Sequence, residues 1–235
     1  MNFHPPKNHI PTDDADLYDA NYFNAYYSND QRRALMYRQE YQRILAHKPI
    51  IGSVLDVGCG VGGLMEIFDD RWRKYGIEPS EFASEKAENK GVQIMRSINT
   101  IESASMDVII FRGTLQHINF PMQTLAQAAR ILKPGGLMVI LATPDTDSLI
   151  YKIWGQLPAL DAPRNWVIFG GRMLVNILKR FEYSEIEVIH PYWKTPYARP
   201  LHDFGNFLLS LFLGWRPFAF PGNMLEIYAV KERIT

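Results

Sequence analysis

The sequence contains very little cysteine: one residue, Cys59, among 235. A single cysteine excludes an intramolecular disulfide and any metal site built from several thiolates. It favours a reducing compartment, so we expect a cytoplasmic protein. The chain also has no excess of charge, with 25 Lys and Arg against 25 Asp and Glu. Balanced charge gives no general attraction to nucleic acid or to an anionic membrane.

Long apolar runs and targeting signals are missing too. No stretch of 18 apolar residues is present, so a membrane-spanning helix is not expected. The opening residues, MNFHPPKNHIPTDD, lack the apolar centre of a signal peptide. The length suits one large domain with an appended lid. We expect a leader and helical cap over 1–48, a ligand-binding core over 49–145, and a lid with the final two strands over 146–235.

Strand-like and helix-like segments alternate through the middle of the chain. Short β-branched runs apolar on both faces, separated by amphipathic segments, predict an α/β fold with a parallel sheet covered on both sides. The predicted strands are 53–58, 74–79, 92–95, 106–113, 134–144, 184–190 and 224–231. The predicted helices are 30–49, 62–70, 80–91, 121–132 and 172–181.

The loop after the first predicted strand, VLDVGCGVGG over 54–63, fits two glycine patterns. Gly58, Gly60 and Gly63 form G-x-G-x-x-G, which is typical of dinucleotide sites but also of a simple tight turn. Asp56, Gly58, Gly60 and Gly62 form D-x-G-x-G-x-G. The two patterns imply different ligands, and the neighbouring acidic residues distinguish between them.

Two acidic residues favour a ligand without phosphate. Asp56 ends an apolar strand just before the glycine turn, where its charge would oppose a pyrophosphate and suit a cationic or amino-bearing ligand. Glu78 ends the second predicted strand twenty positions after Gly58, a place suited to binding ribose hydroxyls. S-adenosylmethionine carries a ribose, a sulfonium and an ammonium group, and it is the predicted cofactor. The alternative for Asp56 is a carboxylate that only caps the glycine loop.

Four segments in order, VLDVGCGVG, YGIEPS, MDVIIFRGTLQHI and ILKPGGLMVILATP, resemble class I S-adenosylmethionine-dependent methyltransferases over about residues 50–145. The resemblance implies a doubly wound, Rossmann-like, mostly parallel seven-stranded sheet whose last strand, 224–231, is antiparallel. It implies that the glycine loop surrounds the methionine part and that Pro79 stacks near the adenine. Ser97 and Ile98 stand where relatives often carry an adenine-binding acid. The predicted cofactor residues are Asp56, Gly58, Cys59, Gly60, Gly62, Glu78, Pro79, Ser97, Ile98, Arg112, Gly113 and Tyr22.

The end of the fourth predicted strand is where the chemistry is expected, because ligands of such folds bind at the carboxyl ends of strands. His117 is the candidate general base, and the alternative is a structural or cofactor-contacting role. Tyr22 lies in an aromatic segment that either covers the cofactor or packs on the first helix. His190 and His202 are weaker candidates. We predict no metal, because no His, Asp and Glu cluster has ligand spacing.

The last third of the chain is expected to bind the acceptor. Residues 162–188 resemble a family segment in which Asn165 replaces a frequent histidine, and Arg164 could bind an anionic group. The predicted acceptor residues are Gln116, Arg164, Asn165 and Trp166. Residues 194–231 resemble methyltransferases of cell-surface polysaccharide synthesis. We therefore expect methyl transfer to a hydroxyl of a glycan or glycan precursor, with a small-molecule O- or N-methyltransferase of secondary metabolism as the alternative.

The apolar run 204–213 is too short to span a bilayer. We expect a buried lid helix there; contact with a membrane or a lipid-linked acceptor, and a dimer interface, are the alternatives. The chain is accordingly expected to be a monomer or a homodimer, with no nucleic-acid partner.

Two rival functions stay open: an NAD-dependent oxidoreductase and a non-catalytic cofactor-binding partner of another enzyme.

Overall fold

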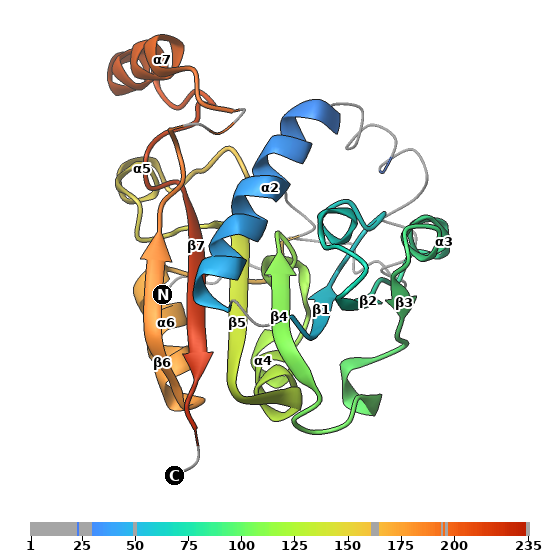
Figure 1. Ribbon diagram of the computed structural model, residues 1–235. Coiled ribbons are helices and arrows are strands. Elements are labelled where there is room, and N and C mark those ends of the chain that lie inside the picture. Colours follow the sequence, from blue (N-terminus) through green and yellow to red (C-terminus); the bar gives the residue numbers. More distant parts are fainter. Residues whose placement is uncertain are drawn as a thin grey trace.

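The computed structural model describes residues 23, 30–48, 51–160, 165–193, 195 and 197–233, and these form one twisted sheet flanked by helices (Figure 1). The seven strands run in the order β3-β2-β1-β4-β5-β7-β6 across the sheet. Their bounds are β1 (Ser53–Val57), β2 (Arg73–Ile77), β3 (Gln93–Ile94), β4 (Met106–Arg112), β5 (Leu132–Pro144), β6 (Tyr183–Ile189) and β7 (Met224–Lys231).

Strand direction follows the prediction from sequence. β1 pairs in parallel with β2 and β4, β2 with β3, and β4 with β5. β7 lies between β5 and β6 and is antiparallel to both. The mostly parallel sheet with an antiparallel strand over 224–231 is therefore confirmed.

Helices cover both faces of the sheet and bury a separate core on each. Their bounds are α2 (Asp30–His47), α3 (Glu81–Glu88), α4 (Pro121–Ile131), α5 (Leu149–Trp154), α6 (Gly171–Arg180) and α7 (Pro200–Leu213). In Figure 1, α2 crosses the front of the sheet, while α4 and α6 lie behind it. Tyr37 and Ile44 of α2 pack with Val54 and Val108 on one face. Leu125 of α4 belongs to the core on the other face, which also includes residues of α6.

Two predicted elements are shorter than expected. Residues 62–70 form only a 3-10 turn, η2 (Met65–Ile67), instead of a helix. The two glycines at its start have low helix propensity, and Gly62 has a positive φ of 73°. Leu64, Met65 and Phe68 are buried in the front core, so packing rather than helical periodicity fixes this segment. The third predicted strand, 92–95, pairs only over Gln93–Ile94.

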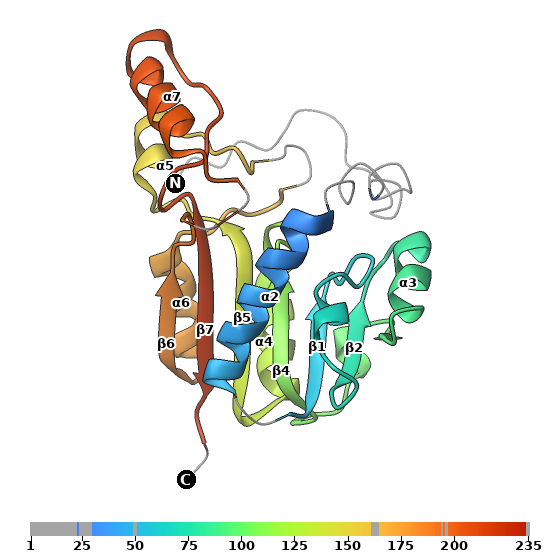
Figure 2. The same cartoon turned by 45° about the horizontal axis from the view of Figure 1, so that its top comes forward.

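The expectation of a buried helix over 204–213 is wrong. Residues 200–213 do form a helix, α7, but most of its large apolar side chains are exposed. Figure 2 shows α7 projecting with α5 beyond the end of the sheet. Among the described residues, no helix is both long and apolar enough to cross a bilayer.

Buried ion pairs attach α2 to the sheet. The Glu40 carboxylate accepts two hydrogen bonds from the Arg112 guanidinium of β4, at 2.8 and 3.1 Å. One turn further, Arg43 donates to Glu226 of β7 at 3.1 Å, and the Tyr228 hydroxyl donates to the same carboxylate oxygen at 2.9 Å. Glu40 and Glu226 are both buried, so each carboxylate depends on its cation for stabilisation.

The replacement Glu40→Ala should lower the free energy of unfolding by about 3–5 kcal/mol, because it removes the buried bidentate partner of the largely enclosed Arg112 guanidinium. Urea denaturation followed by circular dichroism measures the change. Glu85→Ala, at an exposed position of α3, is the matched control and should stay within about 0.5 kcal/mol of the wild type. A loss below 1 kcal/mol in Glu40→Ala would contradict the proposed role of the ion pair.

Candidate functional site

A cavity of about 680 Å³ opens at the carboxyl ends of β1, β2 and β4. Its walls come from the glycine loop after β1, the end of β2, the 3-10 turns η3 (Ile98–Thr100) and η4 (Leu115–His117), and one face of α4. Phe23 and Tyr37, from the N-terminal part of the chain, also line the cavity. Parallel strands place their carboxyl ends together, which explains why these loops meet here.

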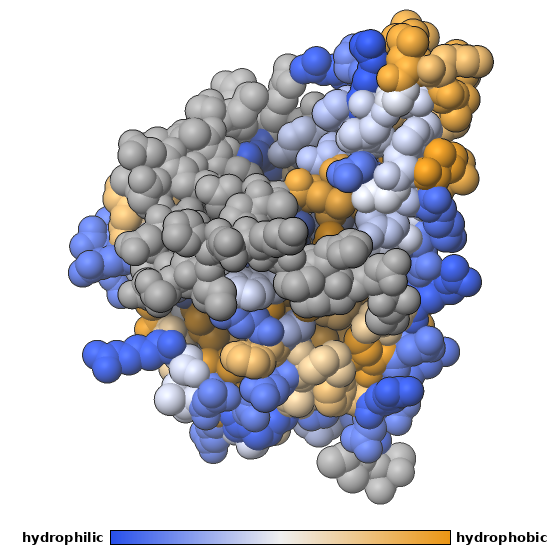
Figure 3. Space-filling model, turned by 180° about the vertical axis from the view of Figure 1, so that it is seen from behind, coloured by the Kyte–Doolittle hydropathy of each residue, from blue (hydrophilic) through white to orange (hydrophobic). Residues whose placement is uncertain are grey.

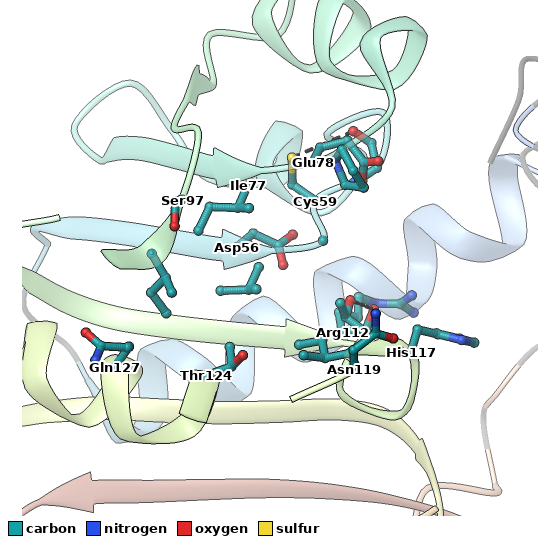
Figure 4. A pocket seen from close by; sticks show the side chains of 18 of the residues that line it. Asp56, Cys59, Ile77, Glu78, Ser97, Arg112, His117, Asn119, Thr124 and Gln127 are labelled. Atoms are coloured by element: carbon teal, nitrogen blue, oxygen red, sulfur yellow. Dashed lines mark hydrogen bonds between the residues drawn. The ribbon is translucent and has the colours of Figure 1, made fainter. Parts of the chain in front are cut away.

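Asp56 is the buried charge of this cavity. It lies in β1 and is only 3 % exposed, and its Oδ1 atom has no hydrogen-bond partner within the described residues. Burial raises the pKa of Asp56 to about 7; the Arg112 cation opposes this rise, and the carboxylates of Glu40 and Glu78 reinforce it. Figure 4 shows Asp56 between Glu78 on one side and Arg112 on the other. A ligand cation beside Asp56 would restore its ionised form.

The glycine loop folds back onto the end of β2. Gly58 and Gly60 have positive φ angles of 79° and 53°, which glycine adopts without strain. The backbone N–H of Gly58 donates to the Ile77 carbonyl at 2.7 Å, and that of Gly60 donates to the Glu78 carboxylate at 2.9 Å. Both glycines line the cavity. Gly62 does not: a Cβ there would lie 3.1 Å from Cα of Ala87, so this glycine permits packing against α3.

Glu78 is held in a fixed orientation by the backbone around it. Its Oε1 accepts the Ser80 N–H and its Oε2 accepts the Gly60 N–H, both at 2.9 Å. Burial raises the pKa of Glu78, and the two backbone donors partly oppose this. Each carboxylate oxygen can accept a further hydrogen bond, so Glu78 can bind a pair of neighbouring hydroxyls. Pro79 lines the cavity beside it.

Cys59 lines the cavity, but its thiol faces the interior of the protein. The residue is buried, and burial raises the pKa of the thiol, which keeps it protonated. A Cβ at Gly76 of β2 would lie only 2.6 Å from the Cys59 Sγ. The small side chain therefore fills the space between the loop and β2, and it lacks the lowered pKa that a nucleophilic cysteine requires.

The far end of the cavity is polar. Ser97 and Ile98 line it, and the Ser97 hydroxyl accepts the Asn99 N–H at 3.2 Å. Thr124 and Gln127 of α4 line the same end and were not predicted. Both are half-buried polar residues that flank the buried Leu125 and Ala128 on α4, and no sequence motif singled them out.

The end of β4 brings together most of the predicted chemistry. Arg112, Gly113 and His117 line the cavity. Gln116 lies behind them: its amide nitrogen donates to the Gly113 carbonyl at 3.0 Å and is 3.4 Å from the His117 Nε2. The Gln116 Oε1 is buried without a hydrogen-bond partner within the described part of the chain.

The predicted acceptor residues adjoin this cavity without lining it. The Trp166 N–H donates to the Gln116 carbonyl at 2.8 Å, which joins the 165–167 segment to η4. Both side-chain polar atoms of Asn165 are buried without hydrogen-bond partners in the described ranges. Tyr22 and Arg164 lie outside the described residues.

The two weaker histidine candidates lie elsewhere. His190 is 3.0 Å from Asp145 in a second cavity of about 540 Å³, beside the start of α6. His202 is on α7, away from the cavity lining. No group of three His, Cys, Asp or Glu side chains within the described ranges could hold a metal ion.

Known proteins resemble this chain in sequence and in fold. A family model described as "Methyltransferase domain" matches residues 28–188. An uncharacterized 37.1 kDa protein in transposon TN4556 of Streptomyces fradiae is 36% identical over 109 residues, covering 41% of this chain and 31% of that protein. A ubiquinone biosynthesis O-methyltransferase of Coxiella burnetii is 26% identical over 155 residues, covering 62% of this chain and 60% of that protein. The chain therefore spans less than two thirds of these relatives.

A solved structure shares the architecture over nearly the whole chain. It is a protein of Thermotoga maritima described as an S-adenosylmethionine-dependent methyltransferase and possible histamine N-methyltransferase. Its TM-score is 0.65 at 19% identity, covering 91% of this chain and 97% of that one. At this identity the similarity shows a shared fold.

Replacing Asp56 by Asn should change how stability depends on pH. The pKa of Asp56 is raised from 3.8 to about 7, so the wild type gains stability from the protonated carboxyl below pH about 4 and loses it as pH rises through 7. Asp56→Asn has no such loss. Its free energy of unfolding relative to the wild type should therefore increase between pH 4 and 8, by on the order of 1–4 kcal/mol.

Urea denaturation without added ligand, repeated across this pH range, measures the difference. Asp70→Asn, at an exposed carboxyl nearby in sequence, is the control and should stay within about 0.5 kcal/mol of the wild type throughout. A difference between Asp56→Asn and the wild type that does not change with pH would show that the Asp56 carboxyl is not perturbed.

Proposed function

The chain belongs to the class I S-adenosylmethionine-dependent methyltransferases, and from this premise we propose that it transfers a methyl group to an oxygen acceptor bound at the end of β4. The observation that carries the proposal is the presence of two carboxylates in one cavity, the buried Asp56 and the half-buried Glu78. Asp56 has an unpartnered oxygen suited to a cation, and Glu78 presents two oriented oxygens suited to ribose hydroxyls.

The cavity residues fit this cofactor. Asp56, with the loop glycines Gly58 and Gly60, would hold the amino-acid end, where an ammonium group offsets the buried negative charge. Glu78 would hold the ribose, and Ser97 and Ile98 would contact the adenine. The guanidinium of Arg112 pairs with the Glu40 carboxylate at 2.8 Å, which offsets its positive charge near the proposed cation.

S-adenosylmethionine supplies a methyl group that its sulfonium already activates. The protein therefore has to align the acceptor, exclude water and, for a hydroxyl acceptor, remove one proton. His117 lines the cavity at the end of β4 and is our candidate for that proton transfer. The neighbouring Gln116 amide, 3.4 Å from its Nε2, helps to orient the ring.

The acceptor is proposed to be a hydroxyl compound of the glycan-precursor class. Gln116 and Asn165, which adjoin the cavity, carry buried amide atoms without partners in the described structure, and a hydroxyl-rich acceptor that extended from the cavity to them would satisfy these atoms. Trp166, 37% exposed beside them, provides a flat apolar surface of the kind on which sugar rings pack. The O-methyltransferase relative supports oxygen as the acceptor atom. A cytoplasmic location stays a prediction.

Glu78→Ala should weaken binding of S-adenosylhomocysteine by about 10–100-fold, because hydrogen bonds to a buried charged group contribute about 1.5–3 kcal/mol. Isothermal titration calorimetry measures the affinity. Glu81→Gln, at an exposed position of α3, is the control and should bind like the wild type.

A thermal shift on the wild type adds a second test, since only the cofactor that binds raises the melting temperature. Stabilisation by NADH but not by S-adenosylhomocysteine would refute the proposal.

His117→Asn should lower kcat by about 10²–10⁴-fold with little change in S-adenosylhomocysteine affinity, if proton removal limits the reaction. The assay is release of S-adenosylhomocysteine with a panel of sugar nucleotides and catechols. His202→Asn, on an exposed histidine outside the cavity, is the control and should retain activity. Equal loss of affinity and rate in His117→Asn would instead assign the ring to cofactor contact.

A further inference from the structure

Helix α7 has its polar and apolar faces reversed relative to a helix that packs on a protein core. Its buried residues include Asp203 and Ser210, which are polar and one heptad apart. Leu201 and Phe212 are 93% and 84% exposed. Its other exposed large apolar residues are Phe204, Leu208, Leu209, Leu211 and Leu213. Figure 3 shows the resulting apolar patch at the end of the molecule that α7 forms.

Hydrogen bonds fix this orientation. The Asp203 carboxylate accepts the Tyr192 hydroxyl at 2.9 Å and the Arg199 N–H at 2.8 Å. The Ser210 hydroxyl oxygen accepts the Arg216 N–H at 3.1 Å. Rotation of the helix to bury its leucines would break the bond to Tyr192 and leave that buried hydroxyl without its acceptor. The apolar face is therefore held outward by the fold.

An aromatic cluster supports α7 from below. The Phe207 ring stacks on Phe220 at 5.1 Å between centroids and packs edge-on against Trp154 and Phe218. The helix thus contacts the rest of the protein along one narrow face, and most of its surface is exposed. Its 14 residues extend roughly 21 Å, which is too short to cross a bilayer.

The charges around α7 indicate what covers it. Segment 193–216 contains three basic residues, Lys194, Arg199 and Arg216, and one acid, Asp203, which is buried. Arg199 and Arg216 are exposed, one at each end of the helix. Trp193 and Tyr197 are exposed beside the first of them. Outward leucine and phenylalanine, basic residues at the ends and nearby aromatic rings are the composition of helices that lie in a membrane interface.

We propose that α7 docks the protein on the surface of an anionic phospholipid bilayer, with its apolar face in the acyl boundary and Arg199 and Arg216 at the headgroups. Anionic lipid complements these cations, each contributing to binding within a Debye length of the surface. A second copy of the chain fits the face less well. Two-fold pairing of α7 would gather the arginines of both copies, and the segment exposes no carboxylate to pair with them.

Helix α7 lies at the same end of the sheet as the cavity. α7 follows β6, and the cavity lies at the carboxyl ends of β1, β2 and β4. β6 runs in the same direction as these strands, since both β5 and β6 are antiparallel to β7. Figures 1 and 2 show α7 projecting beyond this same end of the sheet. Docking through α7 therefore turns the end of the molecule that carries the cavity toward the lipid surface.

The test is sedimentation of the full chain with vesicles of phosphatidylcholine alone or mixed with phosphatidylglycerol. We expect the wild type to sediment with the mixed vesicles, and the double variant Leu201→Gln/Phe212→Gln to bind them at least tenfold more weakly. Leu35→Gln/Met173→Gln removes two exposed apolar side chains from α2 and α6 and should bind like the wild type. Arg199→Gln/Arg216→Gln should reduce binding to the mixed vesicles.

Three results would overturn the proposal. In the first, the wild type stays in the supernatant with both vesicle types. In the second, Leu201→Gln/Phe212→Gln binds as well as the wild type. In the third, light scattering without lipid shows a wild-type dimer that this variant converts to a monomer, which would assign the face to a second copy. The thermal shift with S-adenosylhomocysteine is measured on every variant, so loss of docking is distinguished from loss of folding or of the proposed methyltransferase site.

Discussion

The structure of the site depends on one buried carboxylate. Asp56 is placed at the end of a central strand, where the surrounding protein disfavours its charge and raises its pKa to about 7. The fold offers one of its oxygens no partner within the described residues. The nearby Arg112 cation pairs with Glu40 and lowers the electrostatic penalty on the Asp56 carboxylate. This arrangement is the basis of the proposed binding of a positively charged ligand beside Asp56.

The parts of this site that the sequence predicted are those set by local chemistry. The glycine loop, Asp56 and Glu78 lie within 23 residues, and their residue types and spacing predicted that they would share one site. The antiparallel β7 was predicted through the family resemblance, and the alternation in MLEIYAVK supports it. Contacts between distant segments could not be predicted. Glu40 and Arg112 are 72 positions apart, and only the packing of α2 on the sheet brings them together.

Helix α7 shows the second limit of prediction from sequence. Its high apolar content predicted burial, because burial is the usual fate of leucine and phenylalanine. The sequence does not show that Asp203 and Ser210 face the protein side, where Tyr192 and Arg216 donate to them. Those few hydrogen bonds decide which side of the helix faces outward. Similarly, Gly62 fits the ligand-loop pattern, yet the structure uses it to bring the loop close to α3.

The placement of β7 has a consequence for the order in which the molecule can be assembled. β7 follows β6 in the chain but lies between β5 and β6 in the sheet. During synthesis, β6 and α7 leave the ribosome before the strand that connects β6 to the rest of the sheet exists. Until β7 inserts, the β5 edge is unpaired and the apolar face of α7 is already made, which are the features that attract chaperones or cause aggregation. Completion of the sheet therefore waits for residues 224–231.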